Sequence, residues 1–361
     1  QLICIPSTRP FDLFNPDRKS SLKLYINRVF ITDKCDALIP SYLRFIKGLV
    51  DTQDIDLNVS REMLQNNPAV AKISKSLVGK ILRELKKVSE KNADGYKSFW
   101  KEYGAVLKEG LYEDAERKEA LLDLCRFSTN ENDDPISLSG YVEKMPEKQK
   151  DIYYISAETK DQALASPHLE GFKSKKIPVL IMTDAIDQFW LPMVGSFKEK
   201  KFTSITQGQI NLDDLDEKNK DKKKDDKNKK EKKDKEYVDL VAQLKVVLGD
   251  QVKDIRLSSK LTDSPVCLVA DEGDMDIAME QLMAQRDTNY KGAPRILEIN
   301  GDHSLIKNMK SLLSKKENND LVSDAGTLLF EQARLMEGKM PADPAQFSKI
   351  MNQFLLKAIP N

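Results

Sequence analysis

The sequence predicts a mixed fold class: a layered α/β domain in two sub-blocks, followed by a mixed α+β domain that ends in a helical hairpin. Three observations lead to this prediction. A chain of 361 residues exceeds one domain of about 150 residues. Over residues 1–205, short apolar runs typical of strands alternate with helical periodicity. A charged run at 206–235 then separates these residues from a second part, 236–361.

The first sub-block, about residues 1–140, contains strand and helix patterns in turn. Polar and apolar residues alternate over Leu22–Thr32, which predicts a strand. The apolar pattern of Cys35–Val50 predicts a helix. Apolar residues recur three or four positions apart over Ile73–Val88, which predicts an amphipathic helix packed on a sheet.

The second sub-block, residues 145–205, has the pattern of a strand–helix–strand unit. Asp151–Ser156 is the first predicted strand, and a helix is expected around Glu158–Ala165. The second strand, Ile177–Met182, is apolar on both faces, as in a buried parallel strand. This order is typical of α/β layering.

The run at 206–235 is the sharpest change of composition. Between Asn211 and Glu236 it holds 11 lysines against 10 acidic residues. These charges interleave, so their fields largely cancel within a Debye length of about 8 Å, and we interpret the run as a solvated linker. The whole chain carries 58 basic and 58 acidic residues, which argues against a nucleic-acid-binding protein.

The second part, 236–361, shows the pattern of an α+β domain. Asp343, Pro344 and Gln346 give the start signal of the last helix: an N-cap, a proline in the first turn and a capping-box partner. The predicted helices are Tyr237–Leu248, Met275–Met283, Asp320–Met336 and Ala345–Ala358, and the predicted strands are Val252–Leu257, Val266–Ala270 and Arg295–Ile299.

The last two predicted helices carry more apolar surface than they can hide from each other. Their short connection, Glu337–Asp343, predicts an antiparallel hairpin. Two such hairpins would bury both apolar stripes in a four-helix bundle, so we predict a homodimer. The residues expected at this contact are Leu328, Leu329, Phe347, Ile350, Met351, Phe354 and Leu355.

The cysteine and histidine patterns predict neither a metal site nor a disulfide framework. The four cysteines are far apart and form no CxxC pair, so we interpret them as reduced thiols in the cores. Both histidines follow turn signals and are expected at the surface or in turns. These residues are Cys4, Cys35, Cys125, Cys267, His168 and His303.

Arg61 stands where a cation is unusual. Residues Asn58–Gln65 resemble a loop that enters a helix, with Ser60 as the N-cap. The free N–H groups and the dipole of a helix start favour anions, so Arg61 is expected to meet an anionic partner such as a phosphate. The alternative is a surface salt bridge. No Gly-rich phosphate-binding motif occurs in the sequence.

Several segments resemble the heat-shock protein 90 family of ATP-dependent chaperones, in its bacterial type. They occur in the family's order, from residue 1 to the final helices. The segments are Pro10–Phe14, Lys23–Asp33, Leu38–Asp51, Asn58–Gln65 (NVSREMLQ) and Met145–Ile155 (MPEKQKDIYYI).

The resemblance implies a division of roles between domains. Residues 1–205 correspond to the middle domain and residues 236–361 to the dimerising C-terminal domain, whereas the N-terminal domain that binds ATP with magnesium is absent. Arg61 is implied to contact the γ-phosphate of that ATP, with Gln65 and Asn58 beside it. The full-length protein would then be an ATPase-coupled chaperone, and this fragment alone would be inactive. The alternative function is an ATP-independent dimeric scaffold or holdase.

Unfolded or partly folded client proteins are the implied partners, with neither nucleic acid nor membrane. Met275, Met279, Leu282 and Met283 form a methionine-rich stripe, which fits either a core helix or an adaptable client surface. The other residues implied to contact clients are Phe189, Trp190, Phe11 and Phe14.

The end of the chain, Leu356–Asn361, has no acidic pentapeptide for helical-repeat cochaperones. This departure from eukaryotic cytosolic members favours a bacterial, cytoplasmic protein, with an organellar member as the alternative.

Overall fold

The computed structural model describes residues 1–15, 18, 21–33, 35–55, 64, 67–212, 233–287, 290, 292–313 and 319–359. The chain forms two compact units. Unit 1 comprises residues 1–128, 134–144 and 184–200, and unit 2 comprises residues 129–133, 145–183 and 201–361. The domain boundaries expected from the sequence stay a prediction. The linker at 206–235 stays a prediction, because positions 213–232 lie outside the described residues.

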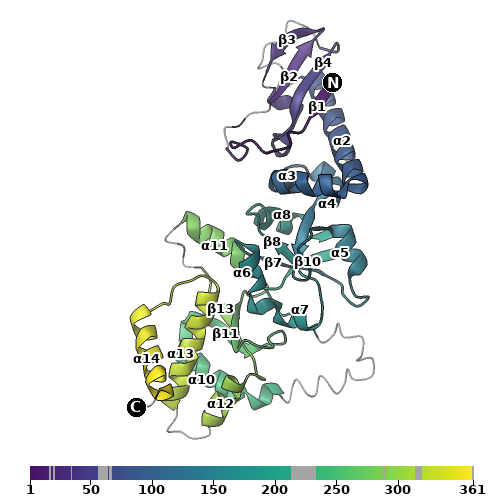
Figure 1. Ribbon diagram of the computed structural model, residues 1–361. Helices are drawn as coiled ribbons and strands as arrows, with labels where there is room; N and C mark the ends of the chain where they lie inside the picture. The colour runs from purple at the N-terminus through teal and green to yellow at the C-terminus, as the bar shows by residue number, and fades with distance from the viewer. Residues whose placement is uncertain are drawn as a thin grey trace. The chain divides into compact units, whose positions relative to one another are not determined.

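Unit 1 begins with a four-stranded sheet of order β1-β4-β2-β3 (Figure 1). Its strands are β1 (Leu2–Cys4), β2 (Ser21–Ile26), β3 (Val29–Thr32) and β4 (Lys47–Thr52). The predicted single strand Leu22–Thr32 is therefore a hairpin. Asn27 and Arg28 have φ values of 50° and 67°, as a two-residue turn between antiparallel strands requires.

The prediction of a helix over Cys35–Val50 is wrong. This segment forms two short 3₁₀ turns, η1 (Asp36–Leu38) and η2 (Ser41–Leu43), and then enters β4. Pro40 lies between the turns and disfavours helical backbone at the residue before it. Gly48 has φ of 144°, and a Cβ there would lie 2.1 Å from the carbonyl oxygen of Leu2. The glycine thus permits β1 to pair with β4.

Helices complete unit 1. The helix predicted over Ile73–Val88 is confirmed within α2 (Pro68–Lys91), whose N-cap Asn67 accepts from the backbone N–H of Ala69 and Val70. The remaining elements are α3 (Ala93–Glu113), η3 (Ala115–Arg117), α4 (Lys118–Leu124), β5 (Arg126–Thr129), β6 (Ile136–Ser137), α5 (Leu138–Lys144), α8 (Asp187–Val194) and β9 (Ser196–Phe197).

Unit 2 contains the predicted strand–helix–strand unit. The strands β7 (Ile152–Ser156) and β8 (Leu180–Met182) are parallel, as expected, and β10 (Lys200–Ser204) runs parallel to β7 on its other side. The connection holds α6 (Lys160–Leu164), η4 (Pro167–Leu169) and α7 (Glu170–Ser174). The apolar side chains of this region form one buried core that extends to Leu212.

The C-terminal part of unit 2 is a three-stranded sheet with helices. Its strand order is β11-β13-β12, with β11 parallel and β12 antiparallel to β13. The predicted strands are confirmed as β11 (Val252–Leu257), β12 (Val266–Val269) and β13 (Arg295–Ile299). The helices are α10 (Val238–Leu248), η7 (Gly249–Gln251), α11 (Ile277–Arg286), α12 (Ser304–Leu313), α13 (Asn319–Met336) and α14 (Pro344–Ala358).

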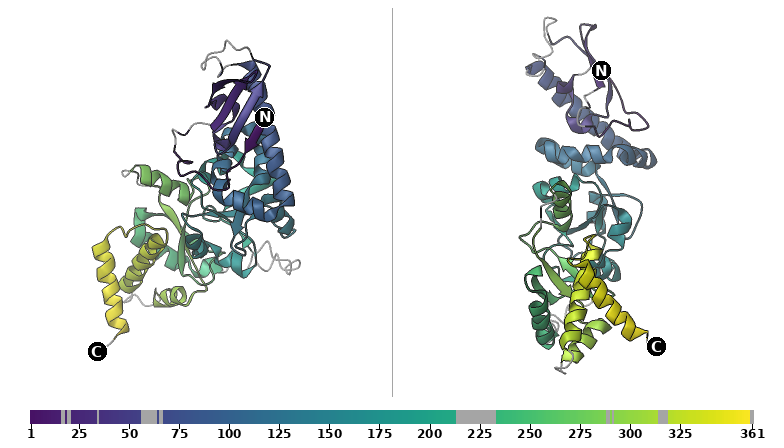
Figure 2. Two further views of the ribbon diagram at one scale, coloured as in Figure 1. Left: turned by 45° about the horizontal axis from the view of Figure 1, so that its top comes forward. Right: turned by 90° about the vertical axis from the view of Figure 1, so that its left-hand side faces the viewer.

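The core of this part lies between the sheet and helices α10, α12 and α13. Helices α13 and α14 form the predicted hairpin and run in opposite directions (Figures 1 and 2). Asp343 caps α14 as expected, since its side chain accepts from the N–H of Gln346. The mixed α/β and α+β class is thus confirmed. Among the described residues, no helix has both the length and the apolarity to span a membrane.

Candidate functional site

The three residues predicted at the nucleotide, Asn58, Arg61 and Gln65, lie outside the described residues, as does the N-cap Ser60. The candidate site that the structure does describe is the surface around α11 in unit 2. Helix α11 begins two residues later than predicted, and Met275 precedes its N-cap, Asp276.

Helix α11 turns charged and polar side chains inward. Glu280 is 3% exposed, whereas Met275 is 40% exposed. Met279, Leu282 and Met283 are half-buried. The methionine-rich stripe is therefore not the core face of the helix, and its side chains keep part of their surface open to solvent. We name Met275, Met279, Leu282 and Met283 the methionine face.

Polar contacts fix the inward face of α11. Glu280 forms an ion pair with the buried Arg295 of β13, and its Oε1 accepts from the N–H of Ala293 at 2.9 Å. Arg295 also donates to the carbonyl oxygen of Met275 at 3.0 Å. Further along the helix, Gln281 donates to the carbonyl oxygen of Glu337 at 2.7 Å. These polar contacts, together with the buried side chain of Ile277, set the orientation of α11.

A cavity of about 630 Å³ lies beside α11. Its walls carry three acidic and three basic side chains, so its charge is balanced. Burial raises the pKa of Glu337 and lowers the pKa of Lys339. The charged lining residues are Glu158, Glu280, Glu337, Arg295, Arg334 and Lys339.

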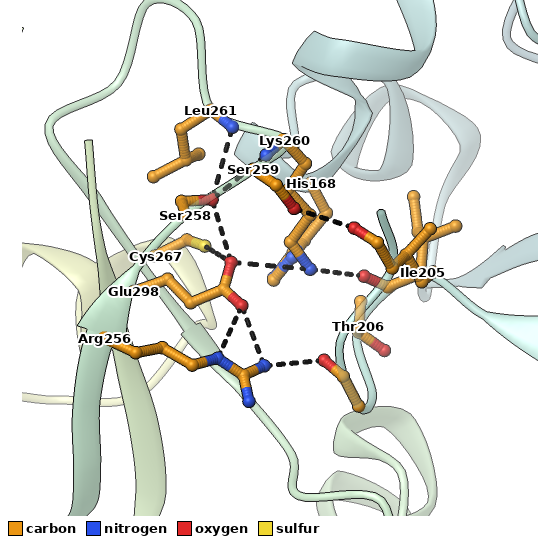
Figure 3. Close-up of polar contacts among 12 residues, drawn as sticks. His168, Ile205, Thr206, Arg256, Ser258, Ser259, Lys260, Leu261, Cys267 and Glu298 are labelled. Carbon is orange, nitrogen blue, oxygen red and sulfur yellow. Dashed lines mark hydrogen bonds and ion pairs between the residues drawn. The ribbon is translucent and has the colours of Figure 1, made fainter. Parts of the chain in front are cut away.

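Residues 204–210, which we call the joint, connect β10 to the C-terminal sheet. Backbone hydrogen bonds join the N–H of Ala270 to Thr206 and the N–H of Gly208 to Ala270, at 2.9 and 2.8 Å. Side chains of the C-terminal part bind three further carbonyl oxygens of the joint. Lys260 donates to Ile205 at 2.7 Å, Arg256 to Gly208 at 2.7 Å and Ser259 to Ile210 at 2.8 Å (Figure 3).

The buried Glu298 carboxylate lies at the centre of these contacts. Arg256 donates to its Oε1 at 2.8 Å, and Ser258 donates to its Oε2 at 2.9 Å (Figure 3). The Lys260 ammonium lies 3.9 Å from the same carboxylate. Burial raises the pKa of the Cys267 thiol beside it, so this cysteine stays protonated and unreactive.

His168 belongs to the same region; it lies in a short 3₁₀ turn, as expected, but it is buried and not at the surface. It is 5% exposed in η4. Burial lowers the pKa of His168 well below its usual value, and the nearby Lys260 lowers it further. The imidazole is therefore neutral at physiological pH. His303, by contrast, lies in a turn before α12 and accepts from the N–H of Leu305 at 3.2 Å.

The hairpin of α13 and α14 exposes a second apolar surface. Of α14, whose residues are all described, only Ile350 is buried. Leu328, Phe347 and Phe354 are half-buried, and Leu329 is buried in the core. The exposed large apolar side chains of the hairpin are Leu335, Met336, Met340, Met351, Leu355, Leu356 and Ile359, and Met340, Leu356 and Ile359 expose more than 70% of their surface.

Comparison with known proteins decides the family. The model of the family described as "Hsp90 protein" matches residues 1–360. The chain belongs to the Hsp90 family. A relative named "Chaperone protein HtpG" in Roseobacter denitrificans is 45% identical over 360 residues, which cover 99% of this chain and 57% of the relative.

Other Hsp90-family relatives give the same result. Proteins of the same name are 45% identical over 358 residues in Paramagnetospirillum magneticum and 42% identical over 361 residues in the Wolbachia of Brugia malayi. These alignments cover 99% of this chain and 57% and 56% of the relatives. The chain therefore spans little more than half the length of the relatives it matches.

The Hsp90-family residues expected at a client surface in unit 1 differ in exposure. Trp190 is fully buried and its indole donates to Asp187 at 2.7 Å, so its prediction as a client contact is wrong. Phe189 on the same helix is half-buried and packs edge-on against Tyr112. Phe11 is fully exposed, and Phe14 is half-exposed with the Arg9 guanidinium 5.7 Å from its ring.

Sequence reasoning missed two kinds of residue in this Hsp90-family chain. Leu356 and Ile359 extend the apolar stripe of α14, and the four-residue spacing of Met351, Leu355 and Ile359 was the available signal. Cys4 is exposed on β1, contrary to the prediction of four core thiols, whereas the other three cysteines are buried. A three-residue edge strand gives no periodicity from which its exposure could be judged.

Proposed function

We propose that this chain is the client-handling and dimerising part of an ATP-dependent chaperone of the bacterial cytoplasm. Its membership of the Hsp90 family, with bacterial relatives named as chaperones, supports the general role. The observation that carries the proposal is the burial pattern of α11. The carboxylate of Glu280 is buried, whereas the methionine face is partly exposed to solvent. Flexible, polarizable methionines suit a surface that accepts many unfolded sequences.

Replacing Met279 and Leu282 together with serine tests the client surface. Binding of a denatured model protein should weaken roughly thirtyfold, since truncating each of the two contact residues costs about 1 kcal/mol. Val246→Ser on α10, where Val246 is 79% exposed, is the matched control and should change nothing. Core positions would instead lose roughly 2–5 kcal/mol of stability each, so a fall in melting temperature with unchanged client binding would contradict the proposal.

A homodimer through the hairpin is the second part of the proposal. Leu355 and Leu356 are exposed in the single chain, so Leu355→Asp with Leu356→Asp should leave the monomer folded. In a four-helix bundle the two carboxylates would be buried without partners, and sedimentation at low micromolar concentration should show monomers. Val246→Asp is the matched control. A doubly substituted chain that stays dimeric would place the interface elsewhere.

Arg61 is proposed to contact the γ-phosphate of ATP bound by a nucleotide-binding domain of the full-length protein, outside residues 1–361. In the full-length protein, Arg61→Ala should slow ATP hydrolysis by about 2–4 kcal/mol of transition-state stabilisation and leave nucleotide affinity nearly unchanged. Single-turnover hydrolysis beside equilibrium ATP binding separates these effects. An unchanged hydrolysis rate would remove Arg61 from the reaction and favour an ATP-independent holdase.

A further inference from the structure

One carboxylate, that of Asp276, joins the joint to the start of α11. Its Oδ1 accepts from the backbone N–H of Ala278 at 3.0 Å, which caps the helix. Its Oδ2 accepts from the hydroxyl of Ser204 at 2.5 Å and from the hydroxyl of Thr206 at 3.0 Å. The two oxygens of a single side chain thus serve two structural elements.

The hydroxyl pair lies at the end of β10. Ser204 is the last residue of that strand and pairs with Tyr154 of β7. Ser204 and Thr206 are both buried, and their hydroxyl oxygens lie 2.8 Å apart; each hydroxyl has a single proton, which the bond to Asp276 uses. Tyr154 bonds the Ser204 side chain, and burial raises its pKa with a further contribution from Asp276. A continuous hydrogen-bond path therefore runs from the β7–β10 sheet to α11.

The contacts around the path are fixed on both sides. The joint is held to the C-terminal sheet by Lys260, Arg256 and backbone bonds, so Ser204 and Thr206 have little freedom to follow α11 if it moves. Gln207, between them and Gly208, donates to the carbonyl oxygen of Asp274 at 2.7 Å, just before the methionine face. The joint is therefore hydrogen-bonded to the segment that leads into α11 in two places, at Asp274 and at Asp276.

We propose that Asp276 is a positioning residue that couples the end of β10 to α11 and so sets the exposure of the methionine face. The proposal rests on the client-binding role proposed above for that face. A carboxylate can accept all three hydrogen bonds at once, because each oxygen has two acceptor sites. In asparagine the single acceptor oxygen can keep the helix cap, but the NH2 group in place of Oδ2 can only donate, so both hydroxyls would have to turn round and their bonds would lose the negative charge.

The first test variant is therefore Asp276→Asn, since asparagine is as good an N-cap as aspartate. The amide proton exchange of α11 should accelerate by about tenfold or more, because hydrogen bonds to a charged group are strong, whereas exchange in β13 should stay unchanged. Asp343→Asn is the matched control. Asp343 caps α14 through one oxygen bonded to the N–H of Gln346, so exchange in α14 should not change.

Removing the donors tests the coupling from the other side. The double variant Ser204→Ala, Thr206→Val leaves the cap of α11 intact and should accelerate exchange in α11 by a similar factor. Adding Asp276→Asn to that background should then have little further effect, since the contact is already lost. Fully additive effects, or equal acceleration in α11 and β13, would overturn the proposal, because they would indicate separate losses or general destabilisation.

Binding of a denatured model protein to the same variants separates this inference from the proposed function. Faster exchange in α11 with altered client binding supports both. Faster exchange with unchanged client binding supports the positioning role of Asp276 and contradicts the client role of α11. Unchanged exchange in α11 for both variant sets overturns the positioning role, whatever the binding result.

Discussion

Each unit contains a buried lysine, and the two ammonium groups are stabilised by different kinds of partner. Lys108 on α3 of unit 1 bonds the carboxylates of Asp184 and Asp187 at 2.8 and 2.9 Å. Burial opposes its charge, but the two carboxylates raise the pKa of Lys108 above its usual value. Lys260 in unit 2 bonds the carbonyl oxygen of Ile205 at 2.7 Å and has its carboxylate, Glu298, at 3.9 Å.

The difference shows what each lysine holds. Lys108 is paired with charge and fixes one regular element, α8, against another, and Trp190 completes the set by donating to Asp187. The shorter contact of Lys260 is with the main-chain carbonyl oxygen of Ile205, which lies outside both sheets. A charge pair suits the permanent attachment of two helices, whereas bonds to carbonyl oxygens hold an irregular segment whose own backbone groups need partners.

The largest effect is expected in unit 1. Lys108→Met would leave the fully buried Asp187 carboxylate without its cation and should reduce the free energy of unfolding by about 3–5 kcal/mol. Both tryptophans of the chain, Trp100 and Trp190, belong to unit 1, so urea unfolding followed by tryptophan fluorescence reports this unit. Lys97→Met at an exposed ion pair is the control and should leave the midpoint unchanged. A small effect of Lys108→Met would mean that Asp187 reaches water or takes up a proton.

A smaller effect is expected for Lys260→Met in unit 2. The variant would leave the Ile205 carbonyl oxygen without this donor, but Glu298 would keep Arg256 and Ser258. The cost should be about 1–3 kcal/mol, measured by calorimetry together with hydrogen exchange in the joint. A loss as large as that of Lys108→Met would show that Lys260 and Glu298 act mainly as a charge pair, and the contrast between the two units would fail.

The smallest effect is a pH dependence that arises from His168 in unit 2. Because the pKa of His168 is lowered on folding, the unfolded chain binds a proton below about pH 6.5 that the folded chain does not. Stability should therefore be complete above that pH and fall by up to about 1.4 kcal/mol per pH unit as pH drops toward the folded pKa. His168→Gln should remove this part of the slope. Equal slopes for the variant and the parent between pH 5 and 6.5 would contradict the assignment.

The sequence carries enough information for most of the C-terminal fold. Val252–Leu257 and Arg295–Ile299 were predicted at their observed bounds, and α14 was predicted from its capping residues to within one residue. These elements are set by local signals: β-branched runs, an N-cap and proline in the first turn. Cys35–Val50 has equally strong apolar spacing, but its outcome depends on pairing with β1 and β2, which are distant in sequence.

Of the candidate site, only the partly exposed methionine face could be predicted from the sequence. The methionine face follows from helical spacing, whereas the burial of Glu280 does not, because its partner Arg295 lies on a strand 15 positions later. The family resemblance alone implies Trp190 as a client contact, and nothing in its local sequence reveals that its indole binds Asp187 inside unit 1. The double role of Asp276 has the same origin, since Ser204 lies 72 residues away.

The apolar surface of α14 makes its helical order depend on what covers it. It has 15 residues, all of them described, and buries only Ile350 within its own chain, while helices of about this length are marginal in isolation. By mass action, whatever covers its apolar side chains also supplies the free energy that keeps it helical. If the homodimer proposed above forms through this hairpin, the helical order of α14 becomes a function of protein concentration and should fall as the chain is diluted.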